Sequence, residues 1–317
     1  MPMKNMLFHL LYALWCLLAL LPLRVHYLLS DVLFVFIFHI LHYRRRTTWV
    51  NLVTSFPEKS QEELLQIERR FYHWFCDYLA ETVKLVGMST EQLRRHMVFK
   101  GTDVVDQCVR DGQSCAVYLG HYCNWEWITS LPLWVSPEAQ CGQIYHPLES
   151  AVFDRLFLHV RQRFGAVCIA TADILRRTVE FKRQGRATVI GYIADQVPHW
   201  NNIHHWCQFL NHDTPVMTGT ERIARKQQQA LFYLDVRRKS RGYYEATFRL
   251  ITRKADELAE FEATDTYYQL LEESIRRQPE LWLWTHNRWK RTRQKFDLHY
   301  MMVDGKVIPK PKPEETT

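Results

Sequence analysis

The 317-residue sequence predicts an α/β fold in which helices flank a mixed central sheet. From about residue 98 onward, short apolar segments alternate with segments of helical periodicity, the pattern of strands interleaved with helices. Apolar residues make up 47% of the chain, which excludes a disordered protein and allows a sizeable core. We expect residues 1–43 to anchor the chain in a membrane, 44–98 to form a helical lead-in, 99–300 to form the α/β domain and 301–317 to be a flexible tail.

The first 43 residues are apolar and almost free of charge. Met6–Leu21 carries no formal charge, Pro22 and Arg24 interrupt the pattern, and a second apolar run extends from Val25 to His42. A straight span needs roughly 20 apolar residues. We therefore expect one tilted span or a shallow hairpin.

Three consecutive arginines, Arg44, Arg45 and Arg46, follow the apolar region. Basic residues beside a span favour the cytoplasmic side, next to anionic head groups. A cleaved signal peptide is a weaker alternative, because the start has only Lys4 and shows no small-residue cleavage site. A buried core helix pair also remains open, because the first run is shorter than a clean span.

The lead-in contains two helix-start signals. Ser60 and Glu63 form a capping box before apolar residues at helical spacing, which predicts one long amphipathic helix, or two, over 61–86. Ser89 or Thr90 begins a short helix that continues through Arg95.

The α/β region divides into six strands and five helices. Strands are expected at Cys115–Leu119, Gln143–Tyr145, Ala166–Cys168, Ala187–Ile193, Ala230–Val236 and Tyr244–Leu250. Helices are expected around 125–132, 149–163, 172–184, 219–228 and 264–277. The tail from Lys306 is rich in Pro, Lys and Glu, and we expect it to be disordered.

The net charge indicates the kind of partner, and the cysteine spacing indicates the cellular compartment. Lys and Arg number 41 against 34 Asp and Glu, and the net charge of +7 suits anionic partners. The eight cysteines include no C-x-x-C pair, which argues against a zinc ribbon or a thioredoxin-type site and favours a reducing compartment. Four histidines at 199, 204, 205 and 212 match no metal-binding spacing, so we expect no metal ion.

The segment SCAVYLGHYCNWEW, residues 114–127, carries the candidate chemistry. An apolar strand ends at Gly120, which we expect to supply a tight turn. His121 in that turn can meet Glu126 on the first turn of the next helix. A carboxylate beside an imidazole fixes its tautomer and stabilises the imidazolium, so this pair predicts a general base that activates a hydroxyl.

The same segment offers a rival nucleophile. No Ser or Cys at a nucleophile elbow precedes His121, which favours direct attack by a substrate alcohol. Cys123 is the alternative nucleophile, but nothing in the sequence indicates a lowered pKa, and we expect it to pack as a small side chain.

At this point the chain resembles the lysophospholipid acyltransferase superfamily and, more closely, the bacterial lipid A biosynthesis (late, or secondary) acyltransferases. The resemblance rests on six blocks in order over about residues 6–295. They are NLVTSFPEKS at 51–60, GHYCNWEW with its His121-x4-Glu126 pattern, RQRFG at 161–165, IADQ at 193–196, TPVMTGTERIARK at 214–226 and PELWLWTHNRWKR at 279–291. Cys123 and Asn211 depart from the family pattern, in which Gly is common, and both could alter the acceptor pocket.

The resemblance implies a glycerolipid acyltransferase-like fold and an enzyme of the bacterial inner membrane with its catalytic domain on the cytoplasmic face. It implies transfer of a fatty acyl group from an acyl-carrier-protein thioester, or from acyl-CoA, onto a hydroxyl of a lipid A precursor. In that family the histidine is the base and the acidic residue holds it, which fits His121 and Glu126. No cofactor is expected, and we expect a monomer that contacts the phospholipid bilayer.

Further residues are expected to contact substrate. Arg161 and Arg163 could hold a phosphate with their guanidinium groups, or could belong to a solvated helix end. Asp195 closes an apolar strand at the edge where α/β ligand sites gather, or caps a helix. Asn124 of the His121 block joins the expected substrate-binding set.

One helix start could bind an anion. Thr218 and Gly219 open this helix, which could bind through its backbone N–H groups or could simply be capped, and Arg222 lies on its basic face.

An aromatic and basic cluster near residue 290 fits a domain that rests on a membrane. It comprises Trp282, Trp284, Arg288, Trp289, Lys290, Arg291 and Arg293. Similar composition can bind nucleic acid, but no nucleic-acid-binding pattern accompanies it, and we expect no such partner.

Three alternative functions remain open. The same site could acylate another lysolipid or glycolipid. Water could replace the alcohol, which would make the protein a thioester hydrolase. The chain could also be a non-catalytic lipid-binding membrane protein, although a pure binder gains little from an oriented base.

Overall fold

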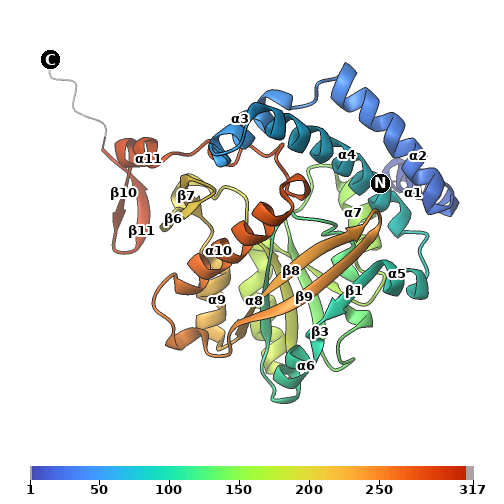
Figure 1. Cartoon of the computed structure of the whole chain (residues 1–317). Helices are drawn as coiled ribbons and strands as arrows, with labels where there is room; N and C mark the ends of the chain where they lie inside the picture. Colours follow the sequence, from blue (N-terminus) through green and yellow to red (C-terminus); the bar gives the residue numbers. More distant parts are fainter. Residues whose placement is uncertain (1, 312–317) are drawn as a thin grey trace.

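The protein is described here by a computed structural model that covers residues 2–311, with a seven-stranded sheet at its centre (Figure 1). The strands of this sheet are β1 (Met97–Lys100), β2 (Cys115–Leu119), β3 (Gln140–Tyr145), β4 (Val167–Ala170), β5 (Thr188–Ile193), β8 (Ala230–Ser240) and β9 (Tyr243–Thr252). Their order is β1-β9-β8-β2-β5-β3-β4. The β8–β9 pair is antiparallel and the other pairs are parallel, so the sheet is mixed, as predicted.

Helices cover the sheet and its edges, as Figure 1 shows. They are α3 (Arg45–Ser55), α4 (Gln61–Leu85), α5 (Thr90–His96), α6 (Thr102–Arg110), α7 (Ala151–Arg161), α8 (Ile174–Arg183), α9 (Gly219–Gln227) and α10 (Glu262–Arg277), whereas α11 (Arg293–His299) lies apart from this sheet. Short 3₁₀ turns occupy Trp127–Leu133, Thr171–Asp173, Trp200–Asn202, Ala255–Glu257 and Pro279–Leu281. All six predicted strands are present, and the helix expected at 125–132 is a 3₁₀ helix.

The predicted capping box begins α4, and the second predicted N-cap, Ser89, begins α5. The Ser60 hydroxyl accepts from the Glu63 N–H at 3.3 Å and the Glu63 carboxylate accepts from the Ser60 N–H at 2.8 Å. Ser89 and Gln92 repeat the arrangement at the start of α5. These reciprocal bonds satisfy backbone donors that the first helical turn leaves without partners, which fixes where α4 and α5 begin.

The N-terminal region forms two helices that meet at Pro22. They are α1 (Pro2–Leu20) and α2 (Leu23–Phe34), and α2 continues as a π-helical turn over Val35–Ile40. By length and composition, Leu23–Ile40 could cross a membrane, whereas the apolar part of α1, Asn5–Leu20, is shorter. Only 22% of the Leu23–Ile40 window is buried, which argues against a pair of core helices.

The C-terminal part differs from the expected flexible tail. Strands β10 (Tyr300–Val303) and β11 (Lys306–Pro309) pair through the turn Asp304-Gly305, in which both residues have positive φ. Val307 packs with Phe296 of α11 and with Ile203 in a small separate core. Figure 1 shows this unit at the opposite end of the molecule from α1 and α2. Residues 312–317 of the expected tail lie outside the described residues.

Three residues of the aromatic and basic cluster near residue 290 are buried, contrary to the membrane-surface prediction for them, whereas Lys290 and Arg293 are exposed. Trp282 is 2% exposed, and Trp284 and Arg288 are fully buried. Arg288 donates to the Pro215 carbonyl at 2.8 Å. These side chains therefore hold the C-terminal segment against the domain and do not present tryptophans to lipid head groups.

Strands β6 (His205–Phe209) and β7 (His212–Val216) form a separate hairpin that the sequence analysis did not expect. Its two-residue turn consists of Leu210 and Asn211, both with positive φ. The Asn211 side chain donates to the Ser55 carbonyl at 2.8 Å, which ties the turn to the end of α3.

Candidate active site

The site forms where two neighbouring parallel strands end at the same edge of the sheet. His121 follows β2 and Asp195 follows β5, and these strands pair in register from Cys115–Val189 to Leu119–Ile193. The carboxyl ends of parallel strands are where α/β proteins gather ligand-binding groups. The strand pairing therefore places the two side chains together.

His121 and Asp195 form a close pair. The imidazole Nδ1 lies 2.6 Å from Asp195 Oδ1, and the backbone N–H of His121 donates to Asp195 Oδ2 at 2.8 Å. Trp282 Nε1 also donates to Asp195 Oδ2, at 2.8 Å. Because a carboxylate only accepts, Nδ1 of His121 carries the proton and Nε2 is left to accept one.

The environment of Asp195 favours its charged form. The carboxylate is 2% exposed. Burial raises the pKa of Asp195, but the imidazole of His121 and the hydrogen bonds to Asp195 outweigh burial, and the pKa falls below its usual range. An ionised Asp195 can therefore stabilise the imidazolium that forms when His121 takes a proton.

Glu126 does not make the contact with His121 that the sequence predicted. Its carboxylate accepts from Arg161 Nε at 2.9 Å and from Arg161 Nη2, and Tyr78 donates to it at 3.5 Å. Glu126 is the N-cap residue of the 3₁₀ helix that begins at Trp127, and from there it faces α7. The carboxylate that orients His121 is thus Asp195, from a different strand.

Arg161 is committed to the same ion pair. Burial alone would lower the pKa of Arg161. The hydrogen bonds to Glu126 and the charge of Glu126 raise this pKa by more, so the net shift is upward. With Nε and Nη2 both bonded to Glu126, this guanidinium adds little net positive charge for a phosphate. It fixes Glu126 in the wall of the site instead.

Two other predicted site residues have structural partners. Asn124 is fully buried, donates to Glu81 Oε2 at 2.6 Å and accepts from the Trp127 N–H at 2.9 Å, so it shapes the loop after His121. Arg163 donates to the Met88 carbonyl at 3.0 Å and to the Leu85 and Val86 carbonyls, which ends α4. Neither residue lines the cavity described next.

A cavity of about 730 Å³ opens beside His121. Its size falls in the range of small-molecule and cofactor sites. Its apolar wall includes Val117, Leu119, Ile128, Leu131, Ile144, Ile174, Ile193 and Leu234, and its polar lining includes His121, Glu126, Arg161, Gln196, Thr218 and Arg222. The imidazole therefore faces a pocket with both apolar and polar walls.

The start of α9 lines this cavity as the sequence predicted. Thr218, Gly219, Thr220 and Arg222 all contribute to the lining. Thr218 is 3% exposed and its side chain forms no cap to the helix. The Thr218 side chain therefore does not cap the first N–H groups of α9, and an anion in the cavity could meet them.

Close packing favours glycine at position 120. A Cβ there would lie 2.7 Å from Leu271 Cδ1 and 3.4 Å from Asp195 Oδ2, and its φ is not in the left-handed region. The expected tight turn is thus not what requires this glycine. On the same helix as Leu271, Tyr267 donates to the Leu119 carbonyl at 2.6 Å and Tyr268 to the Ala194 carbonyl at 2.8 Å, so α10 holds both strand ends.

The two departures from the family pattern have a backbone explanation. Cys123 has φ 54° and Asn211 has φ 63°, which is the region that glycine adopts most readily. Cys123 is fully buried, and burial raises the pKa of its thiol well above the usual value. A thiol in that state is a poor nucleophile, and neither residue lines the cavity.

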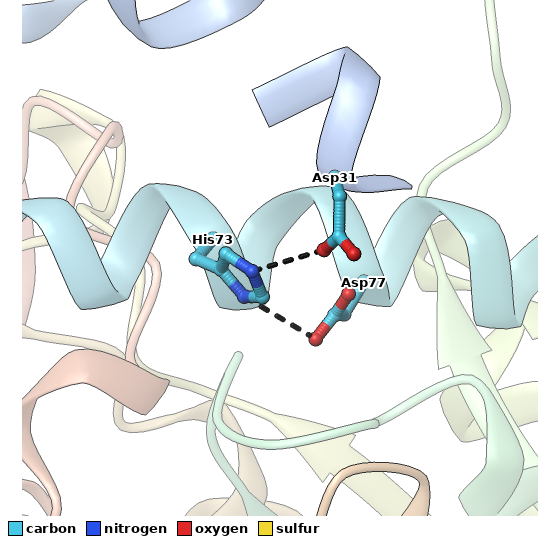
Figure 2. A group of neighbouring side chains, drawn as sticks. All are labelled: Asp31, His73 and Asp77. Carbon is cyan, nitrogen blue, oxygen red and sulfur yellow. Dashed lines mark ion pairs between the residues drawn. The ribbon is translucent and has the colours of Figure 1, made fainter. Parts of the chain in front are cut away.

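A cluster with metal-ligand spacing lies away from the cavity. Figure 2 shows His73 of α4 between Asp31 of α2 and Asp77, with His73 Nε2 3.0 Å from Asp31 Oδ1 and Nδ1 3.7 Å from Asp77 Oδ2. Arg241, between β8 and β9, forms ion pairs with both carboxylates at 2.5 Å and 2.6 Å. The arginine supplies positive charge where a cation would sit, so this group is an ion-pair cluster.

An imidazole held by a carboxylate beside a cavity, in a chain with an apolar N-terminal helix, fits an enzyme that acts on lipids. The chain belongs to the bacterial lipid A biosynthesis acyltransferase family, whose sequence model matches residues 2–291. The family prediction made from the motifs is confirmed.

Curated relatives are distant. A lipid A biosynthesis myristoyltransferase of Escherichia coli K12 is 24% identical over 143 residues, covering 44% of this chain and 43% of the relative. Lipid A biosynthesis acyltransferases 1 and 2 of Shigella flexneri are 24% and 22% identical over 143 and 144 residues. The first covers 44% of this chain and 43% of the relative, and the second 45% and 44%. The alignments thus span less than half of these relatives.

Proposed function

We propose that this protein transfers a fatty acyl group from an acyl-carrier-protein thioester onto a hydroxyl of a lipid A precursor. The observation that carries the proposal is the His121–Asp195 pair, with Nε2 of the imidazole beside a cavity lined by apolar and polar groups. Membership of the family supplies the substrate class. The apolar N-terminal helix supports a place at the membrane, with the arginines at 44–46 favouring the cytoplasmic face.

His121 acts as the general base. Its Nε2 takes the proton of the acceptor hydroxyl while Asp195 holds Nδ1–H, and the resulting alkoxide attacks the thioester carbonyl carbon. The carbon–sulfur bond then breaks, and the imidazolium returns its proton to the leaving thiolate. No covalent enzyme intermediate is needed, which agrees with the burial of Cys123.

The cavity divides into parts suited to the two substrates. The apolar wall accommodates an acyl chain, and we assign phosphate binding to the start of α9, where Thr218, Gly219 and Arg222 line the cavity. Arg161 and Arg163 are less suited to phosphate than the sequence indicated, because Glu126 and backbone carbonyls use their donors. Phosphate groups on the lipid A precursor or on the donor arm both fit this chemistry.

The test is transfer by the purified full-length protein in detergent, with acyl-carrier-protein thioester and a lipid A precursor, followed by mass spectrometry. His121→Ala is expected to lower turnover by about 10²–10⁴, the usual contribution of a general base, with an unchanged melting temperature. His299→Ala, at an exposed histidine of α11, is the matched control. Near wild-type turnover by the His121→Ala variant would contradict the proposed mechanism.

Two further arms separate the alternatives. Replacing the carrier-protein thioester by acyl-CoA identifies the donor, and replacing the precursor by other lysolipids identifies the acceptor. Loss of thioester at the same rate without any acceptor would identify a hydrolase. Binding of the precursor with no turnover of either donor would identify a lipid-binding protein.

A further inference from the structure

The side chain of Gln196 lies next to the nitrogen that accepts the substrate proton. Gln196 follows Asp195 in the bend after β5, lines the cavity, and has its Nε2 3.4 Å from Nε2 of His121. The proposed mechanism gives Gln196 no role, although its side chain lies beside the reacting atoms.

The hydrogen bonds around His121 decide which end of the amide faces the ring. Asp195 accepts the proton on Nδ1 of His121, so Nε2 of the neutral imidazole is an acceptor. Only the NH₂ end of Gln196 can donate to it. The amide of Gln196 therefore presents N–H donors to the space above the base.

Two neighbouring side-chain donors are already in use. Trp282 Nε1 donates to Asp195, and Arg161 donates twice to Glu126. Within residues 2–311, the Gln196 side chain has no hydrogen bond other than the one to His121. Its two N–H donors become available when an acceptor hydroxyl takes the place at Nε2.

We propose that the Gln196 amide is an oxyanion donor, a further catalytic residue of this site. The inference rests on the proposed acyl transfer. As the acceptor oxygen bonds to the thioester carbon, its proton passes to His121 Nε2 and the carbonyl π electrons move onto the carbonyl oxygen. That oxygen forms close to His121, where the amide can donate to it, and the charge disappears when the carbon–sulfur bond breaks.

The test compares Gln196→Ala and Gln196→Met with the wild type and with Gln208→Ala, at an exposed glutamine of β6. Removing one oxyanion donor costs about 10²–10³ in kcat. We expect that loss in both Gln196 variants, with little change in KM for the acceptor. Methionine keeps the side-chain length without donors, so it serves if the alanine variant folds poorly.

The acceptor-independent hydrolysis of the thioester gives the decisive second readout. Hydrolysis passes through the same oxyanion, so an oxyanion donor predicts that hydrolysis and transfer fall by similar factors. Transfer within threefold of the wild type would overturn the inference, as would a loss confined to the acceptor KM. If His121→Ala is inactive while Gln196→Ala is normal, only this inference fails; an active His121→Ala removes the proposed function itself.

Discussion

Asp195 is the residue on which the geometry of the base depends. It accepts from Nδ1 and from the backbone N–H of His121, and so fixes both the tautomer and the position of the ring. Asp195→Asn keeps the shape but lets the wrong tautomer form, and the loss in kcat for such a change in a catalytic triad is about 10⁴. We expect a loss of that order with the fold intact, measured by turnover together with the melting temperature.

Glu126→Gln is the matched variant, because it tests the pairing that the sequence suggested. It leaves the hydrogen bond of His121 to Asp195 in place and removes the charge partner of Arg161. We expect a lower melting temperature and a smaller loss of kcat than for Asp195→Asn. The opposite order of kcat losses would restore Glu126 as the functional partner of His121.

His286 provides a prediction about pH and stability. Burial lowers the pKa of His286 to about 4, below the ordinary value near 6.5 for histidine in an unfolded chain. Between these pH values the unfolded state binds more protons than the folded state, so the contribution of His286 to folding weakens as the pH falls from about 6.5 towards 4. His286→Gln removes this contribution.

The measurement is the urea midpoint of both proteins over that pH range. Burial raises the pKa of Glu81 to about 7, and this carboxyl acts in the opposite direction, since the folded state then binds the extra proton. Because both proteins contain Glu81, the difference between them isolates His286. We expect the wild type to lose more stability than the variant on acidification, and parallel curves would contradict the assignment.

At the scale of an element, Arg163 acts on the end of α4. It donates to the carbonyls of Leu85, Val86 and Met88, at the end of α4 and just beyond it, where helical N–H partners run out. Hydrogen bonds to a charged group contribute about 1.5–3 kcal/mol each, and Arg163 is partly exposed, so we expect Arg163→Ala to lower the free energy of unfolding by about 1–3 kcal/mol.

Measuring the KM of each substrate distinguishes a capping role of Arg163 from phosphate binding by Arg163. Arg163→Ala is expected to leave the KM values for donor and acceptor unchanged, whereas a phosphate ligand would raise one of them. Arg176→Ala is the control, because Arg176 is an exposed arginine paired with Asp173 three residues earlier, and such pairs contribute about 0–1 kcal/mol. A raised KM in the Arg163 variant would support the original expectation.

Elements with a strong local signal could be predicted from the sequence. The strand Cys115–Leu119 is apolar throughout and has the predicted bounds, and α4 begins at the capping box of Ser60. The hairpin β10–β11 was not predicted, although Asp304-Gly305 is a typical two-residue turn. The Pro, Lys and Glu content of the tail is typical of disordered segments and concealed this signal.

The candidate site was predicted in part, since sequence locates residues but not strand order. His121, Thr218, Gly219 and Arg222 were identified and line the cavity, and Asp195 was identified and contacts His121. The partner of His121 was wrong because β2 pairs with β5, and β3 and β4 intervene along the chain. The nearest carboxylate in sequence faces Arg161 instead.

At the scale of the whole molecule, Arg241 connects the apolar N-terminal helices to the catalytic domain. It bonds Asp31 on α2 and Asp77 on α4 from the turn between β8 and β9, where Gly242 packs against Tyr27 so closely that a Cβ would lie 2.0 Å from its hydroxyl. The Ser30 hydroxyl also donates to Asp77, at 2.6 Å. Three distant parts of the chain thus meet at one cluster of charges.

The carboxylate of Asp77 is buried, with 2% of its side chain exposed, and lies next to Asp31. Removing Arg241 leaves this carboxylate without its positively charged partner. Breaking a buried pair in this way costs about 3–5 kcal/mol, and His73 offsets part of it, so we expect the Arg241→Ala variant to unfold at clearly lower temperature or urea concentration. Arg241→Ala combined with Asp77→Asn removes the unpaired charge and should recover part of the loss. Arg253→Ala, at an exposed pair with Asp111, should have little effect.

The same variants decide whether the cluster of Asp31, His73 and Asp77 binds a metal. In the wild type Arg241 competes with any divalent cation for both carboxylates, so added Zn²⁺ or Mg²⁺ is expected to leave the melting temperature unchanged. In Arg241→Ala a cation could replace the lost positive charge, and stabilisation by Zn²⁺ there would show that the arginine substitutes for a metal. Stabilisation of the wild type by micromolar Zn²⁺ would instead show that these three residues form a metal site and that the ion-pair interpretation is wrong.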